Sequence, residues 1–167
     1  MTASKIRNVL FLCTGNSARS ILAEALLNVL GNGSFCAFSA GSQPSGRVQP
    51  FAAELAEHLG YPRALLRSKS WDEFAEPGAP EMDIIITVCD NAAGESCPVW
   101  PGHPAIAHWG VADPAAMEGS DDVRRHAYMD AMTALRRRVE LLVALPEDKL
   151  ERLVAADALR DIAERSA

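Results

Sequence analysis

The 167-residue sequence is 49% hydrophobic and 23% charged, and it carries a formal net charge of −6. Its length suits one domain with a sizeable core, and its acidic balance excludes a general attraction to nucleic acid or to anionic membranes. No apolar run reaches the length of a membrane span or of a signal peptide's apolar region. We therefore expect a cytoplasmic protein that binds neither nucleic acid nor membrane.

The first half of the chain alternates apolar runs with helical patterns. Residues 7–13 form a continuous apolar run of strand length, and residues 20–30 repeat apolar side chains at helical spacing. Residues 35–41 predict a second strand, and residues 50–60 predict a helix with proline at its start and glycine at its end. Residues 67–82 are expected to form a loop with one helical turn.

The second half repeats this alternation with a longer final helix. Residues 83–89 are the clearest buried strand, and residues 105–110 predict a short fourth strand. An apolar stripe over residues 121–145 predicts a long amphipathic helix, and another helical pattern follows Pro146 to about residue 164. The predicted stripe consists of Val123, Ala127, Ala131, Leu135, Val139 and Leu142.

Strands that alternate with helices predict a single α/β domain, a four-stranded and mostly parallel sheet with helices on both faces. We expect the domain to span residues 1–145, with residues 146–167 as its C-terminal helical extension. Binding sites in such sheets lie outside the carboxyl ends of the strands. Cys13, Cys89 and Asp113 each follow or end a predicted strand, so the pattern places all three at one edge of the sheet.

The stretch "CTGNSARS" at residues 13–20 joins the first strand to the first helix. Such a loop directs backbone N–H groups and a helix dipole inward, which suits a tetrahedral oxyanion, and Arg19 adds a bidentate fork. The same field stabilises a thiolate at Cys13, with the Ser17 and Ser20 hydroxyls as donors. The loop is not a Walker loop, which needs Gly-Lys-Ser/Thr. Its candidate oxyanion-binding residues are Thr14, Gly15, Asn16, Ser17, Ala18, Arg19 and Ser20.

Three stretches together carry a family resemblance: "CTGNSARS", "VCDNAAGESCPVWPG" and "HWGVADPAA". Over residues 7–142 the chain resembles arsenate reductases of the low-molecular-weight protein tyrosine phosphatase superfamily, of the thioredoxin-coupled type. The resemblance implies a low-molecular-weight phosphatase-like fold and reduction of arsenate to arsenite in arsenic detoxification. Asp113, followed by Pro114, is then the expected general acid, although this dipeptide also starts turns.

The resemblance also gives roles to two further cysteines. Cys89 is expected to attack Cys13 and release arsenite, and Cys97 to attack Cys89 and carry the disulfide to a reductant. The seven residues between Cys89 and Cys97 are usually one more than in thioredoxin-coupled relatives, so Cys97 could instead be an inert thiol. A zinc site of Cys89, Cys97, His103 and His108 is disfavoured, because the spacings fit none of the compact zinc patterns.

A potassium site beneath the loop is a further implication of the resemblance. Asn16, Glu24, Ser39 and Asp72 match positions that hold the ion in some of these reductases, and oxygen ligands suit a hard cation. Each also has an ordinary interpretation: a left-handed loop position for Asn16, a solvated helix face for Glu24, a helix cap for Asp72. We expect Cys36 to be a buried small hydrophobe. Arg136, Arg137 and Arg138 are expected to line a solvated helix face.

The predicted reaction needs no organic cofactor. It needs an external thiol reductant, which is thioredoxin, glutaredoxin or glutathione, and phosphate or sulfate should compete with arsenate. The sequence does not predict an oligomeric state. Two alternatives stay open: a phosphomonoesterase using Cys13, Arg19 and Asp113, and a non-catalytic oxyanion-binding redox sensor. Against the phosphatase, Ala115 and Ala116 follow Pro114 where an aromatic side chain would be needed to wall a phosphotyrosine ring.

Overall fold

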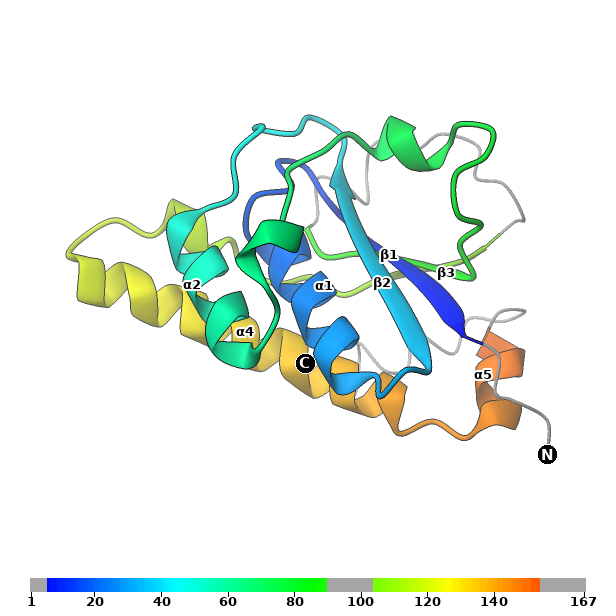
Figure 1. Cartoon of the computed structure of the whole chain (residues 1–167). Helices are drawn as coiled ribbons and strands as arrows, with labels where there is room; N and C mark the ends of the chain where they lie inside the picture. Colours follow the sequence, from blue (N-terminus) through cyan, green and yellow to red (C-terminus); the bar gives the residue numbers. More distant parts are fainter. Residues whose placement is uncertain (1–5, 90–103, 154–167) are drawn as a thin grey trace.

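The computed structural model describes residues 6–89 and 104–153. Its centre is a sheet of four parallel strands in the order β2-β1-β3-β4 (Figure 1). Its strands are β1 (Arg7–Cys13), β2 (Phe35–Gly41), β3 (Ile84–Thr87) and β4 (Ala105–His108). The predicted parallel α/β sheet is confirmed, and β1 is almost wholly buried because strands pair with both of its edges and other elements cover both of its faces.

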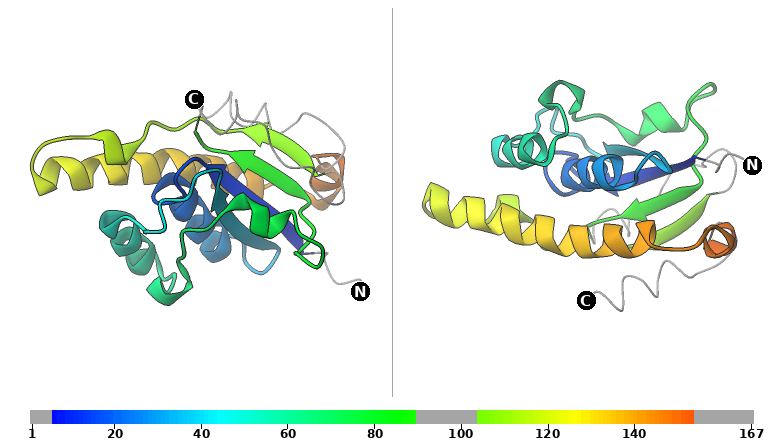
Figure 2. Two further views of the ribbon diagram at one scale, coloured as in Figure 1. Left: turned by 90° about the horizontal axis from the view of Figure 1, so that it is seen from above. Right: turned by 60° about the horizontal axis from the view of Figure 1, so that its bottom comes forward.

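One face of the sheet is covered by long helices. Val9, Phe11, Ile84 and Ile86 point to this face and pack in one core cluster with residues of α1 (Arg19–Leu30) and α4 (Asp121–Val143). α1 contacts both α4 and α2 (Pro50–Leu59). Figure 2 shows α4, in yellow and orange, running along one side of the molecule.

The opposite face carries the alternate strand residues. Leu10, Leu12 and Ile85 pack there against Trp71 and Phe74. Both aromatic residues belong to η2 (Trp71–Phe74), a single turn of 3₁₀ helix, as predicted for this loop. Two more 3₁₀ turns are η1 (Arg63–Leu65) and η3 (Pro114–Ala116). Helical segments therefore cover both faces, although the helix on the second face is only one turn long.

The chain returns to the start of the sheet through α5 (Glu147–Leu153). Leu150 joins the main core cluster, and the Arg7 guanidinium donates to Glu147 at 2.6 Å. Residues 154–167 lie outside the described residues, so the extent of the C-terminal extension stays a prediction. Within the described residues no helix is long and apolar enough to cross a membrane.

The strand order determines where a ligand can bind. The chain moves from β1 outward to β2 on one side, and then to β3 and β4 on the other side. The helices on either side of such a reversal diverge, and a crevice opens at the carboxyl ends of the two central strands. Here those strands are β1, which ends at Cys13, and β3, which is followed by Cys89.

Candidate active site

The loop between β1 and α1 is shaped by backbone hydrogen bonds to residues 42–49. The carbonyl oxygens of Cys13, Thr14, Gly15 and Ser17 accept from the amides of Ser42, Gln43, Ser45 and Gln49 at 2.8–3.3 Å. In a trans peptide the following N–H points away from the carbonyl. The amides of residues 14, 15, 16 and 18 are therefore directed to the inner side of the loop, where an oxyanion would lie.

Gly41 allows the loop to lie this close to the end of β2. A Cβ atom at this position would lie 2.4 Å from the Thr14 carbonyl oxygen and 3.0 Å from the Asn16 amide nitrogen. Both neighbours are backbone atoms that a side chain cannot displace without moving the loop. Glycine is therefore needed here for a close approach.

Asn16 fixes the turn of the loop from within. It is fully buried and has a left-handed φ of 46°, as its ordinary interpretation from sequence predicts. Its side-chain amide donates to Ser20 Oγ at 2.8 Å, and its side-chain oxygen accepts from the Lys69 amide at 2.9 Å. One asparagine thus ties the loop both to α1 and to the segment before η2.

The Cys13 thiol lies at the centre of this arrangement and is only 3% exposed. Asn16 N–H donates to its sulfur at 3.2 Å, and Ser20 Oγ lies 2.9 Å from it. Because Ser20 accepts from Asn16, its own proton is available to the sulfur. α1 has no side-chain cap and no acidic residue in its first turn. The uncapped positive end of α1 therefore lies at the same loop as these two donors.

Arg19 and Asp113 meet at the mouth of the loop. Arg19 Nη1 donates to the Val111 carbonyl at 2.9 Å, and Nη2 lies 3.6 Å from Asp113 Oδ2. Asp113 also accepts from the Ala115 amide at 2.9 Å, as a turn starter does. The sequence left two interpretations of Asp113, a turn starter and a general acid. The geometry is compatible with both, because one carboxylate oxygen accepts from Ala115 and the other faces Arg19.

The segment that carries Asp113 is held from two sides. The amides of Trp109 and Val111 donate to carbonyls of residues 87 and 88, and Arg138 donates to the Gly110 carbonyl at 2.9 Å. Arg138 is only 7% exposed, which corrects the prediction that it belongs to a solvated helix face. Its burial on α4 lowers the pKa of its guanidinium. Its spacing of three from Leu135 places it on the apolar stripe, a feature that could have revealed it.

Cys89 lies beside the loop, as the sequence predicts. Val88 donates its amide to the Leu12 carbonyl at 2.8 Å, so the next residue, Cys89, lies beside the carboxyl end of β1. Its sulfur lies 3.6 Å from the Thr14 hydroxyl, and the residue is 3% exposed. Cys97 lies outside the described residues, and its role stays a prediction.

A buried polar cluster lies beneath the loop around Glu24. The Glu24 carboxylate accepts from Ser39 at 2.6 Å and from Tyr61 at 2.7 Å. The Lys69 ammonium lies 3.9 Å from the same carboxylate, and burial lowers its pKa. Glu24 is thus buried and does not lie on a solvated helix face.

The four predicted potassium ligands do not form a common site. Asn16 accepts from the Lys69 amide, and Glu24, to which Ser39 donates, lies beside the Lys69 ammonium, whereas Asp72 is exposed on η2. The cap before η2 is Ser70, which accepts from the Asp72 amide, so the interpretation of Asp72 as a cap is also wrong. The Lys69 ammonium supplies a positive charge next to Glu24. The residues present therefore fit an internal lysine and do not fit a resident potassium ion.

Two predictions concern residues away from this centre. Cys36 is only partly buried, which corrects the prediction of a buried residue. Its partial desolvation and the Glu24 charge raise the pKa of its thiol, which favours the unreactive form. His108 Nδ1 lies 2.8 Å from the Thr87 hydroxyl. Among the described residues no group of His, Cys, Asp or Glu is arranged to hold a metal ion. Two members of the disfavoured zinc set, Cys97 and His103, lie outside these residues.

Fold and site together define an α/β protein that buries a cysteine inside the loop between its first strand and its first helix. The chain matches the low molecular weight phosphotyrosine protein phosphatase family over residues 8–155 and belongs to that family. Its relatives within the family include the arsenate reductase of Brevibacillus brevis, which is 36% identical over 67% of this chain and 80% of that protein.

Two further comparisons extend over more of the chain. The arsenate reductase of Halalkalibacterium halodurans is 29% identical over 79% of this chain and 91% of that protein. A solved arsenate reductase in the phosphate binding state has a TM-score of 0.63 and 28% identity, and the match covers 83% of this chain and 98% of that one. The relationship to arsenate reductases of this fold, which the motifs suggest, is confirmed.

Proposed function

We propose that this protein reduces arsenate to arsenite. The observation that carries the proposal is a second cysteine, Cys89, buried just after β3 beside the loop that holds Cys13. Ester hydrolysis needs one nucleophile, an anion-binding loop and an acid. Reduction of arsenic needs two electrons as well, and a pair of neighbouring thiols can supply them.

In the first step, arsenate binds to the inward amides of the loop and takes the fork of Arg19. The Cys13 thiolate attacks arsenic and forms a sulfur–arsenic bond. One arsenate oxygen leaves as water after Asp113 gives it a proton. The Asn16 amide and the Ser20 hydroxyl hold the sulfur in place for this attack.

In the second step, Cys89 attacks the Cys13 sulfur. A Cys13–Cys89 disulfide forms and the sulfur–arsenic bond breaks, with its electron pair passing to arsenic. Arsenic(V) becomes arsenic(III) and leaves as arsenite, while two thiols are oxidised to one disulfide. An external thiol (thioredoxin, glutaredoxin or glutathione) then reduces the protein, with Cys97 as the proposed relay.

The phosphomonoesterase alternative uses the same Cys13, Arg19 and Asp113, and the family as a whole is described by phosphatase activity. It assigns no role to Cys89. The redox-sensor alternative predicts stoichiometric binding of arsenate without turnover. The three functions therefore differ in what Cys89 does and in whether arsenite accumulates.

The deciding experiment compares Cys89→Ser with Cys36→Ser, a matched control at a cysteine away from the loop. Arsenate-dependent NADPH oxidation is measured with the thioredoxin and glutaredoxin systems offered separately, and hydrolysis of a small aryl phosphate is measured in parallel. Cys89→Ser should lose arsenite production and keep any aryl phosphate hydrolysis, whereas Cys36→Ser should keep both. Cys13→Ser should lose both activities.

Arsenite production by Cys89→Ser at the wild-type rate would refute the role of the second thiol. A wild-type protein that hydrolyses the aryl phosphate and never forms arsenite, with every reductant supplied, would establish the phosphatase instead. Arsenate binding with neither activity would favour the sensor.

A further inference from the structure

Tyr128 buries a hydroxyl group that has no hydrogen-bond partner among the described residues. The residue is 1% exposed, and its hydroxyl oxygen is one of four buried side-chain atoms without such a partner. An unsatisfied buried hydroxyl is destabilising, whereas phenylalanine would fill the same space without that cost. The hydroxyl is therefore unfavourable in the state that the structure describes.

The ring of Tyr128 is firmly placed between two helices. It packs against Phe51 at the start of α2, with ring centroids 5.5 Å apart, and the guanidinium groups of Arg124 and Arg125 lie over Phe51. Tyr128 is the first buried residue of α4 and lies toward the N-terminal end of the helix, the end that follows η3. The ring is fixed, so the hydroxyl cannot turn outward to find water.

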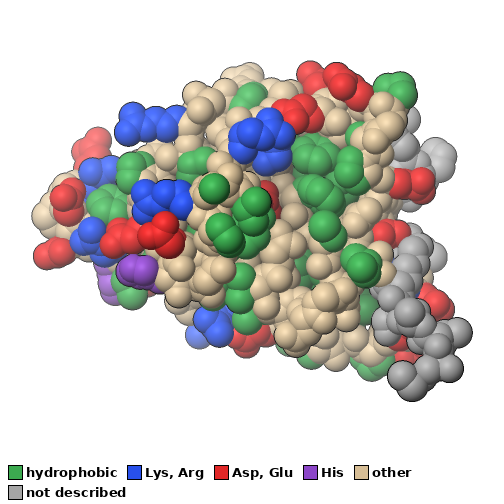
Figure 3. Space-filling model, in the orientation of Figure 1, with side chains coloured by type: hydrophobic (Ala, Val, Ile, Leu, Met, Phe, Trp, Pro, Cys, Tyr) green, Lys and Arg blue, Asp and Glu red, His purple; other side chains and the backbone are tan. Residues whose placement is uncertain are grey.

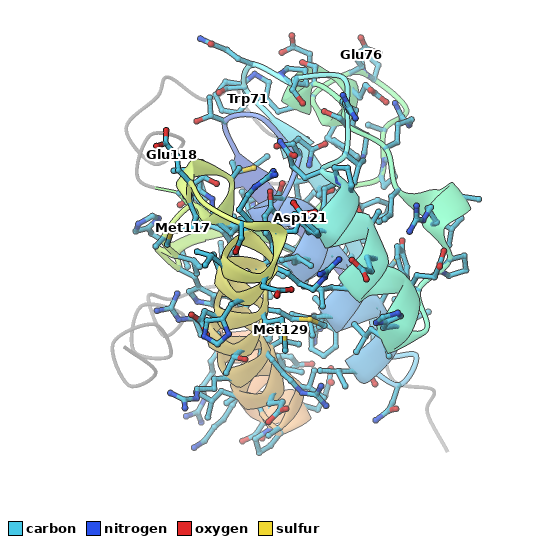
Figure 4. The ribbon with its side chains drawn as sticks, turned by 90° about the vertical axis from the view of Figure 1, so that its left-hand side faces the viewer. Trp71, Glu76, Met117, Glu118, Asp121 and Met129 are labelled. Atoms are coloured by element: carbon cyan, nitrogen blue, oxygen red, sulfur yellow. The ribbon has the colours of Figure 1, made fainter. Side chains whose placement is uncertain are left out.

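This end of α4 lies next to the mouth of the loop. α4 contacts both α1, which begins at Arg19, and η3, which Asp113 caps. Figure 4 views this end and shows α1 and α2 on one side of α4, with Met117 and Glu118, which lead into the helix, on the other. Burial raises the pKa of the Tyr128 hydroxyl, the Asp113 charge raises it further, and Arg124 opposes them. The contacts of α4 with η3 thus bring the helix that carries Tyr128 to the turn that Asp113 caps.

In the described structure Asp113 pairs with Arg19, and it must lose this partner during the reaction. Its carboxylate lies 3.6 Å from Arg19, whose other terminal nitrogen donates to the Val111 carbonyl. An oxyanion in the loop takes the Arg19 fork, because a doubly charged anion surrounded by inward amides binds a guanidinium better than one exposed carboxylate does. Asp113 is then left with only the Ala115 amide.

We propose that Tyr128 is the positioning residue for Asp113: once the oxyanion has taken Arg19, the Tyr128 hydroxyl donates to the Asp113 carboxyl and holds it toward the leaving oxygen. This inference rests on the proposed function, in which Asp113 is the acid. It gives a reason for a tyrosine at a position where phenylalanine would make the folded protein more stable. It also gives the buried donor its partner in the liganded state.

The test is Tyr128→Phe, which removes one oxygen atom and keeps the ring against Phe51. The loss of the free Cys13 thiol is followed by acid quench in a single turnover at saturating arsenate, over a range of pH. A donor to the carboxylate stabilises the charge that Asp113 gains as it gives up its proton. Without it the maximal rate should fall roughly three- to tenfold. The high-pH limb, where protonated Asp113 is lost, should move upward.

The lower maximal rate and the upward shift of the high-pH limb have opposite effects on the rate at high pH. Loss of folded protein cannot produce both. The charged groups that act on Tyr128 are Asp113, which caps η3, and Arg124 on α4; Asp113 in turn pairs with Arg19, and Arg125, next to Arg124, pairs with Glu54 on α2. Only Asp113 among them is expected to change its protonation in the reaction, so the shifted limb is assigned by repeating the measurement in Asp113→Asn. That variant alone should be slower by roughly 10²–10⁴-fold.

The Tyr128→Phe substitution should have no further effect in the Asp113→Asn background, because Tyr128 acts through Asp113. The melting temperature of the single variant Tyr128→Phe should equal or exceed that of the wild type. The matched control is Tyr61→Phe, which removes a hydroxyl bonded to Glu24 and Asn28 and should lower the melting temperature.

The possible outcomes distinguish a failure of the positioning role of Tyr128 from a failure of the proposed function. A Tyr128→Phe protein with the wild-type rate and pH profile, beside a slow Asp113→Asn protein, would overturn the positioning role and leave the proposed function intact. An equal loss of rate from Tyr128→Phe in both backgrounds, with no shift of the limb, would also overturn it. A wild-type rate in Asp113→Asn would remove the acid from the proposed function itself.

Discussion

Arg19 is the residue at which the oxyanion loop and the segment bearing Asp113 meet. In the described state its guanidinium is divided between a backbone carbonyl at residue 111 and the Asp113 carboxylate. Both are weaker partners than a doubly charged oxyanion held by backbone amides. In the proposed reaction, binding of the oxyanion should therefore release Asp113 from Arg19 before Asp113 acts as the acid.

Lys69 should make the protein independent of potassium. Its ammonium already lies 3.9 Å from Glu24, so an added cation would find the position beside that carboxylate occupied. The melting temperature and the rate should be equal in potassium, sodium and choline chloride at one ionic strength. A wild-type melting temperature that rises only with potassium would contradict this.

The variant that sharpens the comparison is Lys69→Met, which keeps the length of the side chain and removes its charge. It leaves the Glu24 carboxylate buried with only the Ser39 and Tyr61 hydroxyls. Removing one partner of a buried ion pair typically costs about 3–5 kcal/mol. We expect a loss of stability at the lower end of that range, because two hydroxyl donors remain.

Individual residues were predictable where the backbone alone fixes their position. Cys13, Arg19 and Cys89 lie at element ends whose place in a parallel sheet follows from the pattern of the chain. Lys69 and Arg138 were not, because each acts by reaching across to a segment far away in sequence. Local patterns describe a lysine between two serines and an arginine triplet, and they do not reveal such partners.

At the scale of elements, the site depends on how closely the end of β2 approaches the oxyanion loop. Gly41→Ala should therefore damage the loop rather than the sheet, since the added Cβ would overlap the Thr14 carbonyl oxygen. Overpacking of this kind costs about 1–3 kcal/mol. A displaced loop should lower the single-turnover rate with arsenate roughly tenfold to a hundredfold.

The matched control is Gly33→Ala, a position with open space around it and a φ of 79°. Its left-handed backbone makes alanine cost about 1–2 kcal/mol, a similar loss of stability far from the loop. That variant should keep the wild-type rate. Equal rates for Gly41→Ala and Gly33→Ala would show that the close approach at Gly41 does not support the site.

Elements were predicted best where one periodicity runs their whole length. β2 is found at the predicted residues, and α2 ends one residue earlier than predicted. The stripe of α4 is confirmed from Ala131 to Leu142, but Val123 is 47% exposed and the stripe begins at Tyr128 instead. The first turns of α4 extend beyond the sheet edge, so a helical period continues there without a core to face.

For the whole molecule, a net charge of −6 opposes the binding of an anion. Figure 3 shows basic and acidic side chains interspersed at the end where α2 and α4 begin. Arg125 on α4 and Glu54 on α2, for example, form an ion pair at 3.4 Å. Such exposed pairs leave little net field. In the proposed function, the attraction for arsenate therefore comes from the loop amides, the start of α1 and Arg19, which all act at short range.

The two ends of the described chain meet in one ion pair, and that contact should contribute to stability without affecting catalysis. Arg7 at the start of β1 is buried, and Glu147 at the start of α5 is about half exposed. Glu147→Gln leaves a buried guanidinium without its counter-charge. Because Glu147 is partly exposed to solvent, the expected loss is only about 1 kcal/mol, measured by urea unfolding.

The double variant Arg7→Met with Glu147→Gln gives the matching comparison. Methionine fills the space of the arginine stem and removes the buried charge, so the double variant should be at least as stable as Glu147→Gln alone. Arsenate turnover should equal that of the wild type in both, since the pair lies at the opposite end of β1 from Cys13. If the double variant is the less stable of the two, the stem of Arg7 and its packing, rather than the buried charge, hold α5 to the sheet.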